Sequence, residues 1–333
     1  MASFSTMKSM VSILYSNIFV NLPIPEGNLS DWTIIVSGSN QGLGYEASKH
    51  LLRLGVHRLI MAVRNCKKGD SARLQLLKAT GREDSSIEVW ELDMDSSLSV
   101  HKFAQRAATL PRLDALLANA GLATTSFSLV EENERTITVN VVNTFLLIGL
   151  LLPKLRESAA KFGITPRISI VNSALHNFVS LQEFDSHNDG GIFAHLNSKE
   201  SANMAGRYPL SKMLVLFGVR ALADRLKESK EPLVIVNSPN PSWCKSELMR
   251  ENSSTGYRLA QCLLARSTEH GSRALVHGIL SGKESNGQYL DNCRVKSPSP
   301  LVTTAKGSQV QEAFFHELFE KLEHQSQGIS QVL

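Results

Sequence analysis

The chain has 333 residues, of which 42% are hydrophobic and 20% charged, so it can bury a sizeable core and is predicted to be globular. The net charge is only +4, and no dense run of Lys and Arg interleaved with aromatic residues occurs, which argues against a nucleic-acid groove. The four cysteines have no Cys-x-x-Cys spacing, so neither a metal site nor a disulfide framework is indicated, and we expect a reducing, cytoplasmic compartment.

Residues 1–30 form an extension ahead of the predicted domain. Apolar residues between Met10 and Phe19 predict a short amphipathic helix that serines interrupt and that is too short to cross a bilayer. We expect this helix to lie on the body of the domain, with contact with a membrane surface as the alternative. The stretch 22–27, which holds two prolines and a glycine, then ends it.

The first predicted strand, residues 33–37, is an uncharged, β-branched run of the kind that is buried on both faces of a parallel sheet. A glycine-rich turn follows, and then a helix pattern to Leu54, which together are the context of a dinucleotide-binding loop. Gly38 permits a tight turn, Gly42 lets the backbone approach a phosphate, and Gly44 lets the helix pack closely. The helix N-terminus offers free N–H groups to a pyrophosphate. A flexible loop with spaced glycines is the alternative. The predicted cofactor contacts of this turn are Gly38, Asn40, Gln41, Gly42, Leu43 and Gly44.

The second predicted strand, residues 58–63, ends in a basic segment. An acidic residue at this strand end would bind the ribose 2′-hydroxyl of NAD, whereas an Arg accepts the 2′-phosphate of NADP. The acid is missing. Arg64, helped by Asn65, Lys67 or Lys68, therefore argues for NADP(H), with solvated loop cations as the alternative.

A third predicted strand, residues 87–93, carries two candidate adenine contacts at its end. Asp93 can contact the adenine amino group while Met94 covers the ring. Asp95 or Ser96 can equally be the N-cap of the helix that follows, so we interpret Asp95 as structural.

The fourth predicted strand, residues 113–118, runs into a short segment without bulky side chains. Such residues would let the backbone pass beside a bound ribose. The predicted contacts are Asn119, Ala120 and Gly121.

A Tyr four residues ahead of a Lys places Tyr208 and Lys212 on one helix face. A neighbouring ammonium lowers the pKa of a phenol by stabilising the phenolate, which is the chemistry of moving a proton on or off a carbonyl oxygen. Taken alone, the pattern is more often an aromatic residue packed on the core beside a solvated Lys.

These motifs, in this order, resemble the short-chain dehydrogenase/reductase family from about Asp31 to about Leu290. The matching segments are Gly38-x-x-x-Gly42-x-Gly44, Asn119-Ala120-Gly121 and Tyr208-x-x-x-Lys212. Within the family, the Arg64-Asn65 strand end and the N-terminal extension are similar to retinol-dehydrogenase-like and fungal secondary-metabolite reductases, which generally use NADPH. The resemblance implies an α/β fold with a single Rossmann-like, doubly wound parallel sheet of about seven strands, helices on both faces, and one domain over residues 31–292.

The resemblance also implies a catalytic set. Asn140, in a helical segment, would link Lys212 to solvent for a proton relay. Ser173, after a fifth predicted strand, would hold the substrate carbonyl, since Asn172 stands where the family often has another serine. Tyr208 would exchange the proton, and Lys212 would lower the Tyr208 pKa and hold the nicotinamide ribose.

Residues 177–205 are expected to cover the substrate pocket, and their apolar aromatics favour a bulky, hydrophobic substrate. The Gly-rich stretch 188–191 predicts a mobile loop. The spacing of His176, His187 and His195 does not fit a metal site, so we expect surface or pocket-lining roles for them.

After a sixth predicted strand at 233–237, the segment 240–248 resembles the family's P-G-x-V-x-T loop beside the nicotinamide. Ser242, Cys244 and Ser246 replace the family's Gly, Val and Thr. Contacts with the carboxamide are implied for the Cys244 backbone and the Ser246 hydroxyl, and no acid or His neighbours Cys244 that would make it a reactive thiol. The implied cofactor contacts are Pro241, Trp243, Cys244 and Ser246.

Four further elements are predicted towards the C-terminus. Residues 251–264 are expected to form a substrate lid, and a helix capped by Thr268 follows. Residues 287–290 read as the last short strand, and the tail 293–333 contains an amphipathic helix at 310–322.

The combined expectation is an NADP(H)-dependent oxidoreductase that transfers hydride between the nicotinamide and a ketone, aldehyde or alcohol of a bulky, hydrophobic small molecule. The alternative is an NADPH-binding module with a non-redox or regulatory role. The expected partner is this small-molecule substrate, with no nucleic acid and no transmembrane segment. A homodimer or homotetramer is implied by the family resemblance.

Overall fold

The computed structural model describes residues 4–184, 191–246, 248 and 255–333. The strands are β1 (Thr33–Ser37), β2 (Arg58–Val63), β3 (Ile87–Glu91), β4 (Ala115–Ala118), β5 (Leu129–Val130), β6 (Asn133–Glu134), β7 (Arg167–Ile170), β8 (Ile235–Asn240), β9 (Tyr289–Asp291) and β10 (Arg294–Val295). The α-helices are α1 (Phe4–Phe19), α2 (Gly42–Arg53), α3 (Cys66–Thr80), α4 (Ser97–Ala108), α5 (Arg135–Ile137), α6 (Asn143–Phe162), α7 (Gly191–Asn197), α8 (Met204–Glu228), α9 (Thr255–Leu264), α10 (Thr268–Leu280), α11 (Pro300–Thr303) and α12 (Ala305–Gln325).

The main sheet has the strand order β10-β9-β8-β7-β4-β1-β2-β3, and every pairing except β9 with β10 is parallel. The doubly wound parallel sheet is therefore confirmed, with eight strands in place of about seven. The additional strand is β10, which turns back from β9 through Asn292 and Cys293. Both residues have positive φ, 52° and 57°, as a tight two-residue hairpin turn requires.

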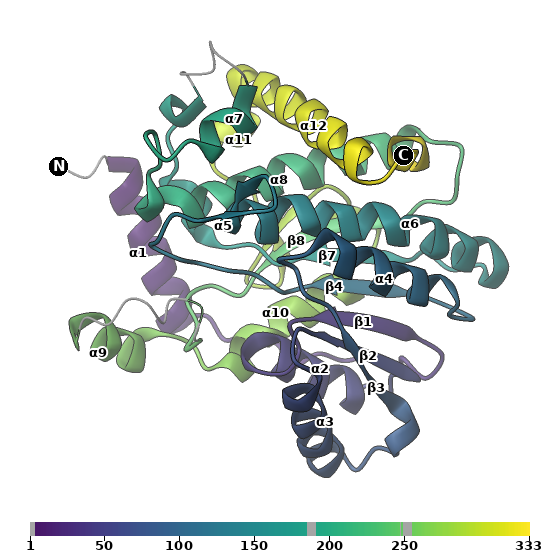
Figure 1. The fold of residues 1–333 in the computed structure, drawn as a ribbon. Helices are drawn as coiled ribbons and strands as arrows, with labels where there is room; N and C mark the ends of the chain where they lie inside the picture. The colour runs from purple at the N-terminus through teal and green to yellow at the C-terminus, as the bar shows by residue number, and fades with distance from the viewer. Residues whose placement is uncertain (1–3, 185–190, 247, 249–254) are drawn as a thin grey trace.

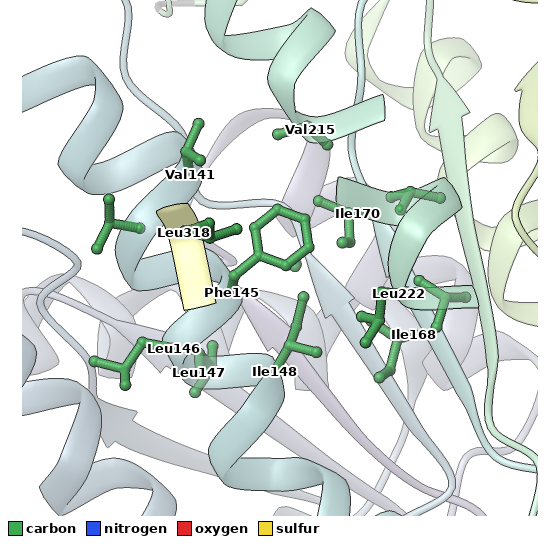
Figure 2. Close-up of a cluster of buried hydrophobic side chains, with 14 of the residues drawn as sticks. Val141, Phe145, Leu146, Leu147, Ile148, Ile168, Ile170, Val215, Leu222 and Leu318 are labelled. Carbon is green, nitrogen blue, oxygen red and sulfur yellow. The ribbon is translucent and has the colours of Figure 1, made fainter. Parts of the chain in front are cut away.

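Helices cover both faces of this sheet, as Figure 1 shows, with α2, α3 and α10 on one face and α4, α6 and α8 on the other. The larger core lies under α6 and α8. In it Phe145 is fully buried, with Ile170 of β7 and Val215 of α8 around its ring (Figure 2). A Cβ at Gly218 would lie 2.2 Å from that ring, so this glycine is needed for the close approach of α8 and α6.

The helix predicted in the N-terminal extension is α1. It contacts α9 and also the segment that follows β7 (Figure 1). It therefore lies on the body of the domain, as expected. Its outward side chains, which include Val11, Tyr15 and Ile18, are exposed, and contact of this face with a membrane surface stays a prediction.

One described stretch, residues 135–162, is long enough to cross a membrane, and an 18-residue window in it has a mean hydropathy of 1.8. In the folded chain 89% of this window is buried, because α6 is a core helix packed against α4. The C-terminal helix α12 packs on α8, and it extends beyond the predicted 310–322 at both ends.

The structure corrects one predicted helix cap and decides between the two alternatives for another. The N-cap of α10 is Ser267, not Thr268, because the Ser267 hydroxyl accepts the His270 N–H. Ser96 is the N-cap of α4. The glycine-rich stretch 188–191 lies mostly outside the described residues, as do His187 and the first part of the predicted lid.

Candidate active site

A cavity of about 900 Å³ opens at the carboxyl ends of the parallel strands. The connections diverge there, because β1 lies between β2 on one side and β4 on the other. Ligands of open α/β sheets bind at this switch point. Every residue predicted to contact the cofactor lines the cavity except Gly44, and Ser173 also lines it.

The glycine-rich turn provides an anion site at the start of α2. Gly38 and Gly42 have φ of +66° and +62°, and a Cβ at Gly42 would meet open space, which leaves the backbone free for a phosphate. The N-cap residue Gln41 makes no side-chain capping bond, and Gln41, Gly42 and Leu43 line the cavity, so the first N–H groups of α2 are available to an anion there. Gly44 does not touch the cavity. A Cβ there would lie 2.5 Å from the Gly38 carbonyl oxygen and from the Asn119 amide, so its role is close packing, as predicted.

The Asn119 side chain holds this turn to the end of β4. Its amide donates to the carbonyl oxygens of Ser37 at 2.9 Å and Gly38 at 3.2 Å. The Ser37 hydroxyl in turn accepts the backbone N–H groups of Asn119 and Ala120. The Asn119-Ala120-Gly121 segment is therefore fixed beside the glycine turn, where a cofactor ribose would lie.

At the end of β2, the Arg64 guanidinium lies at the cavity wall and is 61% exposed. It pairs with Asp95 at 3.5 Å, and Asp95 also accepts two bonds from Arg135, at 2.9 and 2.7 Å. Lys68 lines the cavity beside Arg64. The Asn65 side chain is used differently, because it caps α3 by accepting the Lys68 N–H.

Ser173, Tyr208 and Lys212 meet at the other end of the cavity. A hydrogen bond joins Ser173 to the Tyr208 hydroxyl. The Lys212 Nζ lies 5.6 Å from the centre of the Tyr208 ring and donates to the Val171 carbonyl oxygen at 2.8 Å. One turn of α8 therefore holds the phenol and the ammonium on the same face, as the four-residue spacing predicts.

The electrostatics differ from the sequence-based expectation that Lys212 lowers the pKa of Tyr208. Burial raises the pKa of Tyr208 above its usual value, and the hydrogen bond from Ser173 opposes this only in part. Burial also lowers the pKa of Lys212 to about 8. Desolvation therefore dominates the Tyr208 pKa here, since the Lys212 ammonium is directed at the Val171 carbonyl oxygen, and the lowering of that pKa by Lys212 during proton transfer stays a prediction.

Asn140 lies in a π-helical turn, Thr138–Val142, and does not line the cavity. Its amide donates to the Leu122 carbonyl oxygen at 2.9 Å and to the Ser211 hydroxyl at 3.0 Å, and its oxygen accepts the Leu122 N–H at 2.8 Å. The side chain thus connects the segment after β4 to α8. A proton relay through Asn140 stays a prediction.

His176 is neither a surface nor a pocket-lining residue, which corrects the prediction for it. The ring is fully buried, with Nδ1 2.8 Å from the Ser173 carbonyl oxygen and Nε2 accepting the Ser299 N–H at 3.0 Å. Desolvation lowers the pKa of His176 to about 4, so the ring is neutral and Nδ1 carries the donated proton. His176 therefore fixes the backbone at Ser173. His195 is partly exposed on α7 and does not line the cavity.

The segment after β8 crosses the cavity beside Lys212. Ser242 has φ +65°, a conformation that glycine adopts without strain. Serine in place of the family's glycine therefore strains the backbone here. Cys244 is buried, its thiol contacts the Pro241 carbonyl oxygen, and burial raises the pKa of that thiol to about 12. Cys244 is therefore an inert packing residue, as expected from its sequence context.

The sequence analysis missed several residues that line the cavity. Arg135 lies at the polar end of the cavity and bonds Asp95. The sequence indicated Arg64 and Asp95 at this end, but nothing in it indicated Arg135. Met10, Ile13 and Leu14 of α1 lie at the apolar end of the cavity. Ile13 and Leu14 follow Met10 by three and four residues, which places them on one face of a helix. The missed residues include Met10, Ile13, Leu14, Leu122, Arg135 and Leu175.

Within the described residues, no group of three or more His, Cys, Asp or Glu side chains could hold a metal ion. The site therefore offers polar and apolar organic contacts: an anion-binding helix terminus, a basic strand end, and a Ser, Tyr and Lys cluster.

Known proteins resemble this chain in sequence and fold. Residues 32–174 match the family model described as short chain dehydrogenase. The chain is 43% identical over 323 residues to the short chain dehydrogenase/reductase dmxR8 of Cryptosporiopsis sp., with 96% of this chain and 99% of that protein covered. It is 42% identical to the short-chain dehydrogenase anuD of Penicillium roqueforti, with 98% of this chain and 86% of that protein covered.

Solved structures with the same fold include a putative uncharacterized protein from Mycobacterium paratuberculosis, at 22% identity and a TM-score of 0.63, with 88% of this chain and 95% of that chain covered. A putative short chain dehydrogenase from Shigella flexneri in complex with NADP has 22% identity and a TM-score of 0.56, with 80% and 98% covered. The expected family likeness is confirmed by the sequence relatives. This chain belongs to the short-chain dehydrogenase/reductase family of oxidoreductases.

Proposed function

We propose that this protein is an NADP(H)-dependent oxidoreductase that transfers hydride between the cofactor and a carbonyl carbon of a bulky, hydrophobic small molecule. The observation that carries the proposal is one cavity that joins the anion site of α2 to Ser173, Tyr208 and Lys212. We also propose a cytoplasmic role in secondary-metabolite biosynthesis, in keeping with the fungal relatives.

The residues at the polar end fit NADP(H). Arg64, held by Asp95, and Lys68 would receive the 2′-phosphate, and the first turn of α2, which has no acidic residue, would receive the pyrophosphate. The bound cofactor supplies the hydride. The Shigella relative, which has the same fold, was solved with NADP.

The residues at the other end provide the proton chemistry. Ser173 would donate a hydrogen bond to the substrate oxygen and so fix it against Tyr208, which would give that oxygen its proton. Lys212 carries the ammonium that would stabilise the phenolate left behind and bind the cofactor ribose. Water is restricted here, because Tyr208 and Lys212 are 9% and 6% exposed.

The cofactor part of the proposal is tested by calorimetry with NADPH and NADH. An Arg64→Ala variant should bind NADPH about tenfold more weakly, because a charge-assisted contact with a phosphate is worth about 1.5–3 kcal/mol when buried and less at an exposed site. NADH affinity should be unchanged. Lys67→Ala is the matched control, since Lys67 is exposed in the first turn of α3, three residues after Arg64, and does not line the cavity. Equal affinities of wild type and Arg64→Ala for NADPH would refute the assignment.

A further inference from the structure

One face of α1 forms part of the active-site cavity. Met10, Ile13 and Leu14 line it, and Asn17 continues the same face, since the four positions follow the i, i+3, i+4, i+7 spacing of a helix stripe. Val11 and Ile18 lie outside this stripe and are exposed. The helix thus presents two different faces, of which only one contacts the site.

This stripe lies at the apolar end of the cavity. The neighbouring lining residues there come from the segment that follows Ser173, from the segment after β8 and from α9: Leu175, Phe178, Trp243, Leu248 and Ala260. Of the charged residues that line the cavity, Arg64 and Asp95 follow β2 and β3 in the cofactor half, and Lys212 lies on α8 beside Tyr208. A substrate carbonyl held at Ser173 and Tyr208 would therefore have the rest of its molecule beside α1.

Asn17 fastens α1 to the loop that crosses the cavity. Its amide donates to the carbonyl oxygens of Trp243 at 2.8 Å and Leu264 at 3.0 Å, and its oxygen accepts the Ser242 hydroxyl at 2.6 Å. Ser242 is the residue with φ +65°, a conformation that costs a non-glycine residue about 1–2 kcal/mol. The hydrogen bond from its hydroxyl to Asn17 helps to hold that conformation.

The C-terminal end of α1 is fixed by a buried cation. The Arg266 guanidinium, 3% exposed, donates to the carbonyl oxygens of Ser16 at 2.6 Å and Val20 at 3.3 Å. It also donates to Asn292 at 2.8 Å, and the Asn292 amide donates to the Ser16 hydroxyl at 2.9 Å. A cation at the last carbonyls of a helix is favourable both as a cap and through the helix dipole. The helix end is therefore tied to the segment between α9 and α10 and to the β9–β10 turn.

We propose that α1 is a structural wall of the active site with two functions. Ile13 and Leu14 contact the substrate and select a carbonyl compound that carries a large apolar ring system, and Asn17 positions the 241–246 loop over the cofactor site through Ser242. The inference rests on the proposed function and extends it, because it names the residues that recognise the substrate.

The wall is tested with two carbonyl probes, 9,10-phenanthrenequinone as the large apolar one and 2,3-butanedione as the small one. In an Ile13→Ala/Leu14→Ala variant, the KM for the quinone should rise about tenfold or more, since each truncation removes about three apolar carbons from the contact. The KM for butanedione and the NADPH affinity should change less than about twofold. Val11→Ala/Ile18→Ala is the matched control on the exposed face and should leave all three values unchanged.

An unchanged quinone KM in the Ile13→Ala/Leu14→Ala variant would overturn the wall while leaving the proposed function intact. If wild type oxidises NADPH with neither probe, the proposed function fails, and calorimetry of the quinone with the NADP⁺ complex still decides the wall. Weaker quinone binding by the variant than by wild type would support it, and equal binding would overturn it.

The positioning role of Asn17 is tested by a rescue. Asn17→Ala should weaken NADPH binding about tenfold, because the loop loses the bonds of Asn17 to the Ser242 hydroxyl and the Trp243 carbonyl oxygen. Adding Ser242→Gly should recover part of that affinity, because glycine adopts φ +65° without strain. A merely structural role of Asn17 would lower the stability of both variants without this recovery, and that result would overturn the positioning role.

Discussion

His176 makes a quantitative prediction about the pH dependence of stability. Desolvation lowers its pKa to about 4 from 6.5, an effect that the bond to the Ser173 carbonyl and the charge of Asp291 oppose only in part. The folded protein therefore holds His176 neutral while the unfolded chain becomes protonated below pH 6.5. Because the unfolded state then binds more protons, stability is fully present above pH 6.5 and is lost as the pH falls towards 4. Between about pH 7.5 and about pH 5 the loss from this one group is about 2 kcal/mol.

The assay is urea unfolding of wild type and of His176→Asn at these two pH values. The variant should be less stable than wild type at the higher pH, since it loses the bond to the Ser299 N–H and the ring contact with Tyr289. Its free energy of unfolding should nevertheless fall by about 2 kcal/mol less on acidification. His57→Asn, a change at an exposed ring, is the control and should fall in parallel with wild type. A parallel fall of His176→Asn would refute the buried, neutral state of this ring.

Three further predictions concern the glycine turn, the ammonium and the hairpin. Gly44→Ala should weaken NADPH binding and destabilise the fold by about 1–3 kcal/mol, because the new Cβ would lie 2.5 Å from the Gly38 carbonyl oxygen. Gly256→Ala, whose Cβ would meet open space, is the control and should be neutral. Calorimetry with NADPH and urea unfolding check both variants. NADPH affinity should fall as the pH rises through about 8, where the Lys212 ammonium loses its proton. A Lys212→Arg variant that binds NADPH should show no such fall. A flat pH profile of affinity for wild type would contradict the role of this charge. Cys293→Gly should raise the free energy of unfolding by about 0.5–1 kcal/mol, because glycine favours φ +57° in the β9–β10 turn, and a loss of stability would contradict this.

The parallel sheet and the cofactor half of the site could be predicted from the sequence because their signals are local. One continuous stretch of chain holds the uncharged run at 33–37, the glycines that follow it, and Arg64 at the position where an acidic residue would indicate NAD. The Tyr208 and Lys212 pair could likewise be found from a four-residue spacing.

The remainder depends on tertiary contacts that no local pattern records. Asn17 bonds the Trp243 carbonyl across 226 residues of sequence, so the helix pattern marks one face of α1 but does not show that this face lines the cavity. The direction of the Tyr208 pKa shift follows from burial, which the Tyr-x-x-x-Lys spacing does not contain. His176 resembled a surface residue until the fold placed it beneath Ser173.

The central claim, that this cavity reduces carbonyl compounds with NADPH through Tyr208, is tested most directly by one comparison. NADPH oxidation is followed at the nicotinamide absorbance band with a panel of bulky ketones and aldehydes, for wild type and Tyr208→Phe, alongside NADPH calorimetry. We predict turnover by wild type, a fall of about 10²–10⁴-fold in the variant, and NADPH affinities within about twofold of each other. Equal turnover of the two proteins, or no binding of NADPH by wild type, would contradict the account.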